Sequence, residues 1–247
     1  MIRLLRYGIF LVILSACTHH LHVSEVKTSH YEVKTSKNDS ITNLSVLPYK
    51  EKLDKEMNQV IAYSDSALTR EGREPLVGNF VMQAMDVYVT MANPRSRNEF
   101  ILLMNYGGLR NALPSGNITK QNIFELMPFD NELVIIDISG AKLKECIFYM
   151  ARSGKLLSVE IGFTLTDTII SEIKIGKKDF NENQNYRIVT TDYIANGGDN
   201  CTFFKDPLKY ETANFKLRDA ILYYCEWLTK KNIHIKPLRL GRVKISK

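Results

Sequence analysis

The clearest hydrophobic periods along this chain are helical. In PLVGNFVMQAMDVYV, residues 75–89, six apolar side chains recur every three or four positions and so share one helical face, and Pro75 suits the first turn. The same spacing predicts helices over 141–151 and 214–229. Two more polar segments are also predicted to be helical: 48–59 from its composition, and 120–126 because Thr119 is suited to cap its N-terminus.

Strand patterns lie between these helices. The segments 60–67, 100–104 and 132–139 are short apolar runs, and Gly140 ends the last of them. The region 155–191 divides into several strands at polar turns. Because strands and helices are interleaved without a regular βαβ repeat, the sequence predicts an α+β fold, with a mixed β-sheet core and packed helices.

The first 45 residues show a different pattern. Arg3 and Arg6 precede the run GIFLVILSA, which is much shorter than the ~20 residues that span a bilayer, so we expect a signal peptide over 1–16. The segment LSAC, 14–17, resembles a bacterial lipobox, which predicts cleavage before Cys17 and lipidation of its thiol. Residues 17–45 are predicted to form a polar tether and 46–247 the folded domain. We therefore expect an extracytoplasmic protein, lipid-anchored to a bacterial membrane on the periplasmic side or at the cell surface.

Composition mainly excludes alternatives. A chain of 247 residues with 45% hydrophobic content can bury a full core, so disorder is excluded. The formal net charge of +6 would fall to +4 without the signal peptide, and the basic residues are scattered, so nucleic acid is not an expected partner. There is no CxxC pair and no histidine between His30 and His234, so no metal site is predicted in this chain.

Candidate chemistry gathers in four loops, each at the end of an apolar element. In NYGGLR, 105–110, the two glycines would let a ligand approach the main chain, and the planar donors of Arg110 suit phosphate or carboxylate. A tight turn with a solvated arginine is the alternative for this stretch alone. The other loops are GREPLVGN (72–79), MPFDN (127–131) and DYIANGGDN (192–200). Together they hold arginines, aromatic rings and an aspartate, which suit the phosphate, base and ribose of a nucleotide.

These loops, with SGNIT at 115–119, stand in the order and at the approximate spacing of a known set of motifs. The chain from about Gly72 to Phe203 resembles the C-terminal domain of the bacterial and animal 5'-nucleotidase family, which includes the periplasmic UDP-sugar hydrolases. The corresponding family patterns are RE-x-GN, N-x-GG-I-R, G-x-IT followed by LPF-x-N, and ANGGD. The fold that the resemblance implies is that of the family's substrate-binding domain.

The resemblance also implies roles for residues of the first two loops. The family's matching arginines hold the phosphates of the substrate, which assigns Arg73 and Arg110 to that role. Asn105 would contact the edge of the base, and Gly107 and Gly108 would bring the main chain to the ligand. Alternatively, Arg73 is an ordinary loop charge or a partner of its neighbour Glu74, and Asn105 caps the turn.

Roles in the last two loops follow in the same way. Family members hold the base between two aromatic rings, which here are Phe129 and Tyr193, and such stacking contributes ~1 to 3 kcal/mol per base. Tyr193 stands where phenylalanine is commoner. Asp199 would accept hydrogen bonds from the ribose hydroxyls, with Asn196 and Gly198 shaping its loop. The alternatives are that Phe129 belongs to the core and that Asp199 is a turn residue.

Complete 5'-nucleotidases carry, in addition, an N-terminal metallophosphoesterase domain with D-x-H and GNH segments around two divalent metals. Neither segment occurs in this sequence, so no catalytic residue is predicted. The expected function is that of the nucleotide-binding half of a 5'-nucleotidase, which releases phosphate from nucleoside 5'-monophosphates, with two divalent metals held by a separate metallophosphoesterase chain. The alternatives are a stand-alone nucleotide-binding lipoprotein without catalysis, and a structural module that has lost its ligand.

Overall fold

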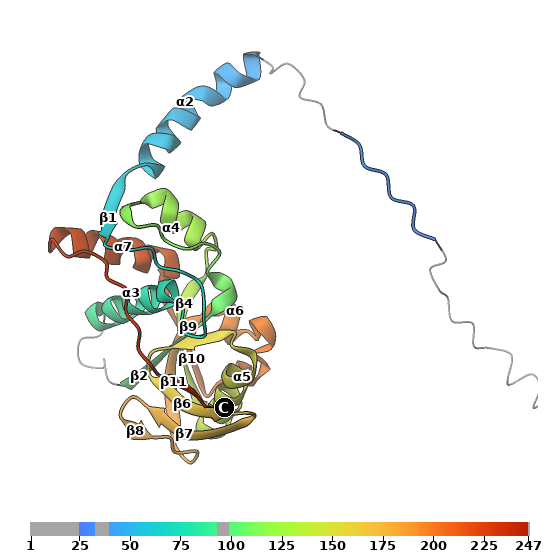
Figure 1. The fold of residues 1–247 in the computed structure, drawn as a ribbon, viewed down its shortest axis with the longest axis vertical. Helices are drawn as coiled ribbons and strands as arrows, with labels where there is room; N and C mark the ends of the chain where they lie inside the picture. Colours follow the sequence, from blue (N-terminus) through green and yellow to red (C-terminus); the bar gives the residue numbers. More distant parts are fainter. Residues whose placement is uncertain (1–24, 33–39, 93–98, 247) are drawn as a thin grey trace, which may run out of the picture. The chain divides into compact units, whose positions relative to one another are not determined.

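The computed structural model describes residues 25–32, 40–92 and 99–246, and the chain divides into two parts, Met1–Ser45 and Val46–Lys247. In the first part, residues 25–32 form neither helix nor strand. Helix α2 (Ser40–Met57) begins in this part and continues into the second (Figure 1). The predicted signal peptide and Cys17 lie outside the described residues.

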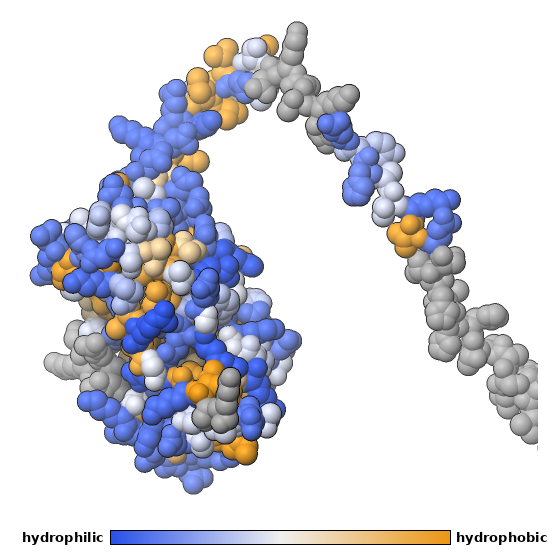
Figure 2. All heavy atoms as spheres, in the orientation of Figure 1, coloured by the Kyte–Doolittle hydropathy of each residue, from blue (hydrophilic) through white to orange (hydrophobic). Residues whose placement is uncertain are grey.

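Helix α2 has no buried residue. Figure 2 shows hydrophobic side chains exposed along it. Those that are largely accessible are Ile41, Leu44, Val46, Leu47, Tyr49 and Leu53. Among the described residues, no helix has both the length and the apolar character needed to cross a bilayer.

A five-stranded mixed sheet forms the centre of the second part (Figure 1). Its strands, in spatial order, are β10 (Lys209–Lys216), β4 (Glu132–Ser139), β9 (Asn185–Thr191), β2 (Phe100–Asn105) and β5 (Leu156–Ser158). Strands β2 and β9 run parallel, and the other neighbouring pairs are antiparallel. The register of β4 against β9 runs from Leu133 opposite Thr191 to Ser139 opposite Asn185.

The inner strands of the sheet are buried on both faces. Alternate residues of β2 point to opposite sides, as the pleat requires: Phe100, Leu102 and Met104 join the core built with α3 (Leu76–Ala92) and α7 (Leu217–Lys230), whereas Ile101 and Leu103 join the core built with α5 (Gly140–Ser153). The short helix α4 (Lys120–Leu126) contributes to the first core. Burial on both faces explains why β2 is a continuous apolar run rather than an alternating one.

Two smaller sheets complete the second part. Strands β1 (Val60–Ser64) and β3 (Gly116–Thr119) form an antiparallel pair. The other sheet has the order β11 (Val243–Ser246), β6 (Ile161–Thr166), β7 (Ile169–Ile175) and β8 (Lys178–Asp179), with β11 parallel to β6. The remaining helices are short: α6 (Asp192–Ala195) and the 3-10 turns Tyr106–Gly108, Gly198–Asn200 and Thr202–Phe204.

The loop that precedes α3 anchors the C-terminal segment. The Glu74 carboxylate accepts hydrogen bonds from three consecutive amides, those of Gly241 (2.9 Å), Arg242 (2.7 Å) and Val243 (3.1 Å). In α3 itself, the buried Asn79 donates from Nδ2 to the carbonyl of Leu238 at 2.7 Å. Two residues of the REPLVGN motif, Glu74 and Asn79, therefore hold the segment 238–243, which leads into β11.

The α+β class and the mixed sheet are confirmed, and several element boundaries differ from the sequence prediction, three of them in ways that have a structural reason or change an element. Helix α2 starts at Ser40 and includes Pro48, so the predicted start at residue 48 was wrong. The first strand ends at Ser64 rather than at residue 67. The last long helix starts at Leu217 rather than at 214, because the residues before it form edge strand β10, KYETANFK, which has no buried residue and carries no apolar alternation. Strand β10 forms because it pairs with β4 at the edge of the sheet, which its own sequence pattern did not indicate.

Candidate functional site

A cavity of about 320 Å³ in the second part is bordered by three loops that lie far apart in the sequence. Its lining residues are Asn105, Gly107, Gly108, Arg110, Phe129, Asn131, Tyr193 and Asp199. The structure thus brings together all the residues predicted from the sequence except Arg73, Asn196 and Gly198. Asn131 belongs to the MPFDN motif but was given no role.

The sheet topology explains why these loops meet. Parallel neighbours β2 and β9 end at the same edge of the sheet, so the loops that follow Asn105 and Thr191 emerge side by side. Strand β4 is antiparallel to β9 and places Leu133 opposite Thr191, so β4 begins where β9 ends. The MPFDN loop immediately precedes β4 and is therefore brought to the same edge.

Asp199 is held in a left-handed backbone conformation, with φ 51° and ψ 32°. Its carboxylate accepts hydrogen bonds from Asn105 Nδ2 at 2.7 Å and from the Tyr193 hydroxyl at 3.1 Å. Its carbonyl accepts one from the Tyr149 hydroxyl of α5 at 2.5 Å. Burial of Tyr149 raises the pKa of that phenol above its usual value of 10, so Tyr149 stays a donor at neutral pH. The aspartate is therefore fixed from three directions, and Asn105 holds the carboxylate rather than capping its own turn.

The ring of Tyr193 packs closely over Gly198. A Cβ on Gly198 would come within 2.5 Å of both Cε1 and the carbonyl oxygen of Tyr193, so only glycine leaves space for the ring. Asn196 lies at the end of α6, where its Nδ2 donates to the carbonyl of Asp192 at 2.8 Å. Asn196 and Gly198 thus support the loop without lining the cavity.

Phe129 is 37% exposed and Tyr193 46% exposed. Phe129 is therefore not a core residue, which was the alternative left open by the sequence. The Arg110 guanidinium lies 5.0 Å from the centre of the Phe129 ring, a distance typical of a cation–π contact. The Arg110 guanidinium and the Phe129 ring therefore lie in contact at the cavity.

Arg218 of α7 holds the MPFDN loop in position through hydrogen bonds to its main chain. Arg218 is 9% exposed and donates from Nη1 to the carbonyls of Met127 and Phe129, both at 3.3 Å. Its Nη2 forms an ion pair with Asp130, which also pairs with Lys216 at 2.9 Å. Hydrogen bonds from Lys216 and Arg218 hold the pKa of the Asp130 carboxyl below its usual value of 3.8. Sequence reasoning missed Arg218, because it occurs in a helical pattern 89 residues away from Phe129.

The two arginines of the segment TREGRE lie in different places. Arg73 donates from Nη1 to the carbonyl of Ala151, in the last turn of α5, at 2.6 Å, and it does not line the cavity. Arg70 donates from Nη1 to the carbonyl of Arg110 at 3.2 Å and lies 5.2 Å from the ring centre of Tyr106. Its buried Nε has no hydrogen-bond partner among the described residues. Arg70, not Arg73, therefore contacts the NYGGLR loop. The sequence does not distinguish the two arginines; the positions of their side chains in the structure do.

Neither thiol nor metal chemistry is evident at this site. Cys146, Cys201 and Cys225 are buried and unpaired, and burial raises the pKa of Cys201 and of Cys225 to about 12. Cys146 and Cys225 are small buried residues of the two cores. Within the described ranges, no group of three or more His, Cys, Asp or Glu side chains could hold a metal ion.

Sequence comparison and structural comparison both relate this chain to 5'-nucleotidases and other nucleotide phosphoesterases. Residues 57–206 match the family model described as 5'-nucleotidase, C-terminal domain. The chain is 26% identical over 241 residues to the trifunctional nucleotide phosphoesterase protein YfkN of Bacillus subtilis, covering 82% of this chain and 16% of that protein. It is 28% identical over 197 residues to an apyrase of Tabanus yao (69% and 36%), and 26% identical over 195 residues to a 5'-nucleotidase of Vibrio cholerae (77% and 35%). The chain therefore spans at most 36% of the length of these three relatives.

Solved structures show the same fold. A 5'-nucleotidase precursor from Thermus thermophilus superposes with a TM-score of 0.69 at 22% identity, over 83% of this chain and 43% of that one. A putative 5'-nucleotidase from Staphylococcus aureus gives 0.65 at 15% identity, over 87% and 46%.

Proposed function

We propose that this chain, which belongs to the 5'-nucleotidase C-terminal domain family, supplies the nucleotide-binding half of a reaction that releases phosphate from nucleoside 5'-monophosphates. One observation carries the proposal: a single cavity gathers Arg110, Phe129, Tyr193 and Asp199 from three separate loops. These side chains offer a guanidinium for phosphate, aromatic faces for a base and a carboxylate for ribose hydroxyls.

Each side chain has a distinct part in this proposal. The base stacks on Phe129 and Tyr193, both of which expose their rings. Arg110 binds the phosphate, and the bare main chain at Gly107 and Gly108 allows the ligand to come close. Asp199 accepts from the ribose hydroxyls, and Asn105 and Tyr193 keep its carboxylate in a fixed orientation. Asn131 would add a polar contact at the edge of the same cavity.

The proposal assigns phosphate release itself to two divalent metals in a separate metallophosphoesterase chain. It is supported by the lack of D-x-H and GNH segments in this sequence. Such metals polarise the phosphate and activate water. This chain would bind and orient the ester.

We also propose that lipidation of Cys17 anchors the protein on the extracytoplasmic side of a bacterial membrane. The support is the sequence of residues 1–17 alone, in which two arginines, a short apolar run and small residues precede the cysteine. Mass spectrometry of the protein purified from membranes tests this point. A mature N-terminus at Cys17 carrying acyl chains is expected, and an unmodified or uncleaved chain would refute the proposal.

Calorimetric titration of the full-length chain with AMP and UMP tests the binding site. Replacing Arg110 with alanine is expected to weaken binding about tenfold to thirtyfold, because a charged contact to phosphate is lost. The matched control is Arg152→Ala, which removes an exposed arginine outside the cavity and should leave affinity unchanged. Equal binding by the wild-type and Arg110→Ala proteins would contradict the assignment.

Mixing experiments test the catalytic part. Phosphate release from AMP is expected only when a metallophosphoesterase chain and a divalent metal are added to this protein. Nucleotide binding without activity in any mixture would instead favour a stand-alone nucleotide-binding lipoprotein. Absence of nucleotide binding would favour a module that has lost its ligand.

A further inference from the structure

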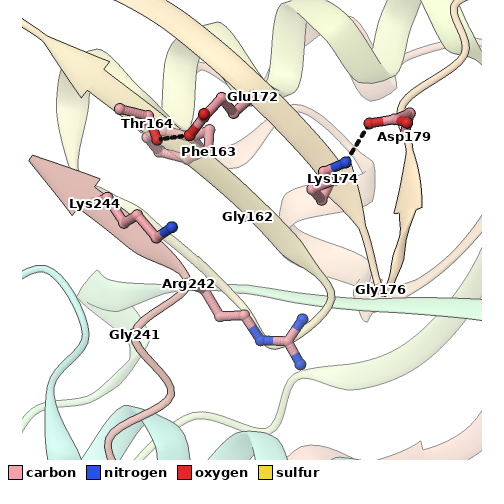
Figure 3. Close-up of a pocket in the computed structure, with 10 residues that line it drawn as sticks. All are labelled: Gly162, Phe163, Thr164, Glu172, Lys174, Gly176, Asp179, Gly241, Arg242 and Lys244. Atoms are coloured by element: carbon pink, nitrogen blue, oxygen red, sulfur yellow. Dashed lines mark hydrogen bonds and ion pairs between the residues drawn. The ribbon is translucent and has the colours of Figure 1, made fainter.

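A second cavity, of about 460 Å³, lies on the four-stranded sheet and shares no lining residue with the first (Figure 3). Gly162, Phe163 and Thr164 of β6, the strand between β11 and β7, contribute to its lining. Residues of β7 and β8 border one side, and Arg242 and Lys244, at the start of β11, border the other (Figure 3).

The charges on the two sides are not equivalent. On the β7 side both carboxylates already have partners: Glu172 accepts from the Thr164 hydroxyl at 2.6 Å, and Asp179 pairs with Lys174 at 2.5 Å. On the other side, Figure 3 marks no hydrogen bond or ion pair between Arg242 or Lys244 and the other residues drawn. Arg242 also lines an adjoining cavity together with Asp86 and Glu160. Burial raises the pKa of the Glu160 carboxyl to about 7, and the charge of Arg242 opposes this rise only in small part. Two basic groups with no direct partner among the residues drawn therefore border the cavity.

The register of the sheet sets the dimensions of this site. Lys244 is paired with Thr164, and Lys174 is paired with Gly162. Strands lie ~4.8 Å apart and alternate residues ~6.7 Å apart, so the cationic side chains frame an area of roughly 7 by 10 Å. Gly162 has no side chain within it, and a Cβ there would come within 3.3 Å of the Arg242 carbonyl. The middle of the site is thus left open for a small anion.

Arg242 is positioned by the protein rather than by a ligand. Its own amide and those of Gly241 and Val243 donate to the Glu74 carboxylate. Its carbonyl accepts from the amide of Phe163 in β6 at 3.1 Å. A backbone fixed on both sides lowers the entropy lost when the side chain binds.

We infer that this cavity is a phosphate-binding site formed by Arg242 and Lys244. A guanidinium offers planar paired donors and an ammonium adds a point charge, and together they match the charge and the several acceptor oxygens of a phosphate group. The phosphate comes either from a soluble ion or from the head group of an anionic phospholipid. The inference is independent of the nucleotide cavity, because the two sites share no residue.

Titration with inorganic phosphate tests the soluble source. The full-length chain carrying Arg110→Ala is used, so that the nucleotide cavity does not contribute the measured heat. Adding Arg242→Gln and Lys244→Gln is expected to weaken phosphate binding at least tenfold, whereas Arg242→Lys, which keeps the charge, should retain most of it. The matched control is Lys230→Gln with Lys231→Gln, which removes the same charge from two exposed positions at the end of α7.

Co-sedimentation with vesicles tests the lipid source. The full-length chain is compared on phosphatidylcholine vesicles and on vesicles that contain phosphatidylglycerol, so that any acyl anchor contributes equally to both. If the source is lipid, phosphatidylglycerol increases binding of the wild type and of the Lys230/Lys231 control, but not of the Arg242/Lys244 variant. The inference is overturned if neither phosphate nor phosphatidylglycerol binds, or if the Arg242/Lys244 variant binds both as the wild type does.

Discussion

Replacing Arg218 with methionine is expected to lower the free energy of unfolding by about 3 kcal/mol and to weaken nucleotide binding, although Arg218 does not line the cavity of Arg110 and Phe129. The side chain is almost fully buried and donates to the carbonyls of Met127 and Phe129. Methionine fills a similar volume but cannot donate, so both carbonyls lose a charged partner. The loop that carries Phe129 would then sample other conformations, and the aromatic face would no longer be preorganised.

Urea unfolding and calorimetric titration with AMP measure the two effects. Lys216→Met is the matched control, because Lys216 also pairs with Asp130 but is only half-buried and donates its hydrogen bond to that carboxylate, not to the loop carbonyls. It should change the free energy of unfolding by less than about 0.5 kcal/mol. If the Arg218→Met protein unfolds at the wild-type urea concentration and binds AMP equally well, Arg218 does not position this loop.

Stability is expected to fall between pH 5 and pH 8 because of Glu160. Burial raises the pKa of this carboxyl from 4.5 to about 7, and the nearby Asp86 carboxylate adds to the shift. The folded state therefore binds a proton that the unfolded state releases in this range, so folding is favoured at low pH and the advantage is lost as pH rises toward 7. Because the Glu160 side chain keeps some exposure, the free energy of unfolding is expected to fall by about 2 to 3 kcal/mol between pH 5 and pH 8.

The Glu160→Gln protein should lack this pH dependence and be more stable than the wild type at pH 8. Glutamine is neutral, and its side-chain oxygen can still accept the hydrogen bond that Glu160 takes from the Leu102 amide at 2.9 Å. The control is Glu125→Gln, at an exposed position of α4, which should keep the wild-type trend. Urea unfolding at pH 5, 6, 7 and 8 gives the comparison, and identical curves for wild type and Glu160→Gln would exclude Glu160 as the cause.

Local patterns made much of the fold predictable. The apolar period of α3, the Thr119 cap of α4 and the stop at Gly140 each depend on residues within three or four positions of one another. The hydroxyl of Thr119 accepts from the Asn122 amide, as a helix cap requires. Strand β10 escaped prediction because its polar sequence is stabilised at the sheet edge by pairing with β4, not by its own pattern.

The sequence by itself determined the α+β class, the membership of the family and the three loops that line the cavity of Arg110 and Phe129. Each of these depends on the apolar period, the turn glycines or the order of motifs along the chain. The tertiary structure alone decided which polar side chain reaches which partner. It placed Arg70 rather than Arg73 beside Arg110, gave Glu74 the amides of residues 241–243, and put Arg218 beneath Phe129. The physical reason is distance: Arg73 and its acceptor are 78 residues apart and Arg218 and Phe129 are 89 apart, so each contact depends on how strands and helices pack.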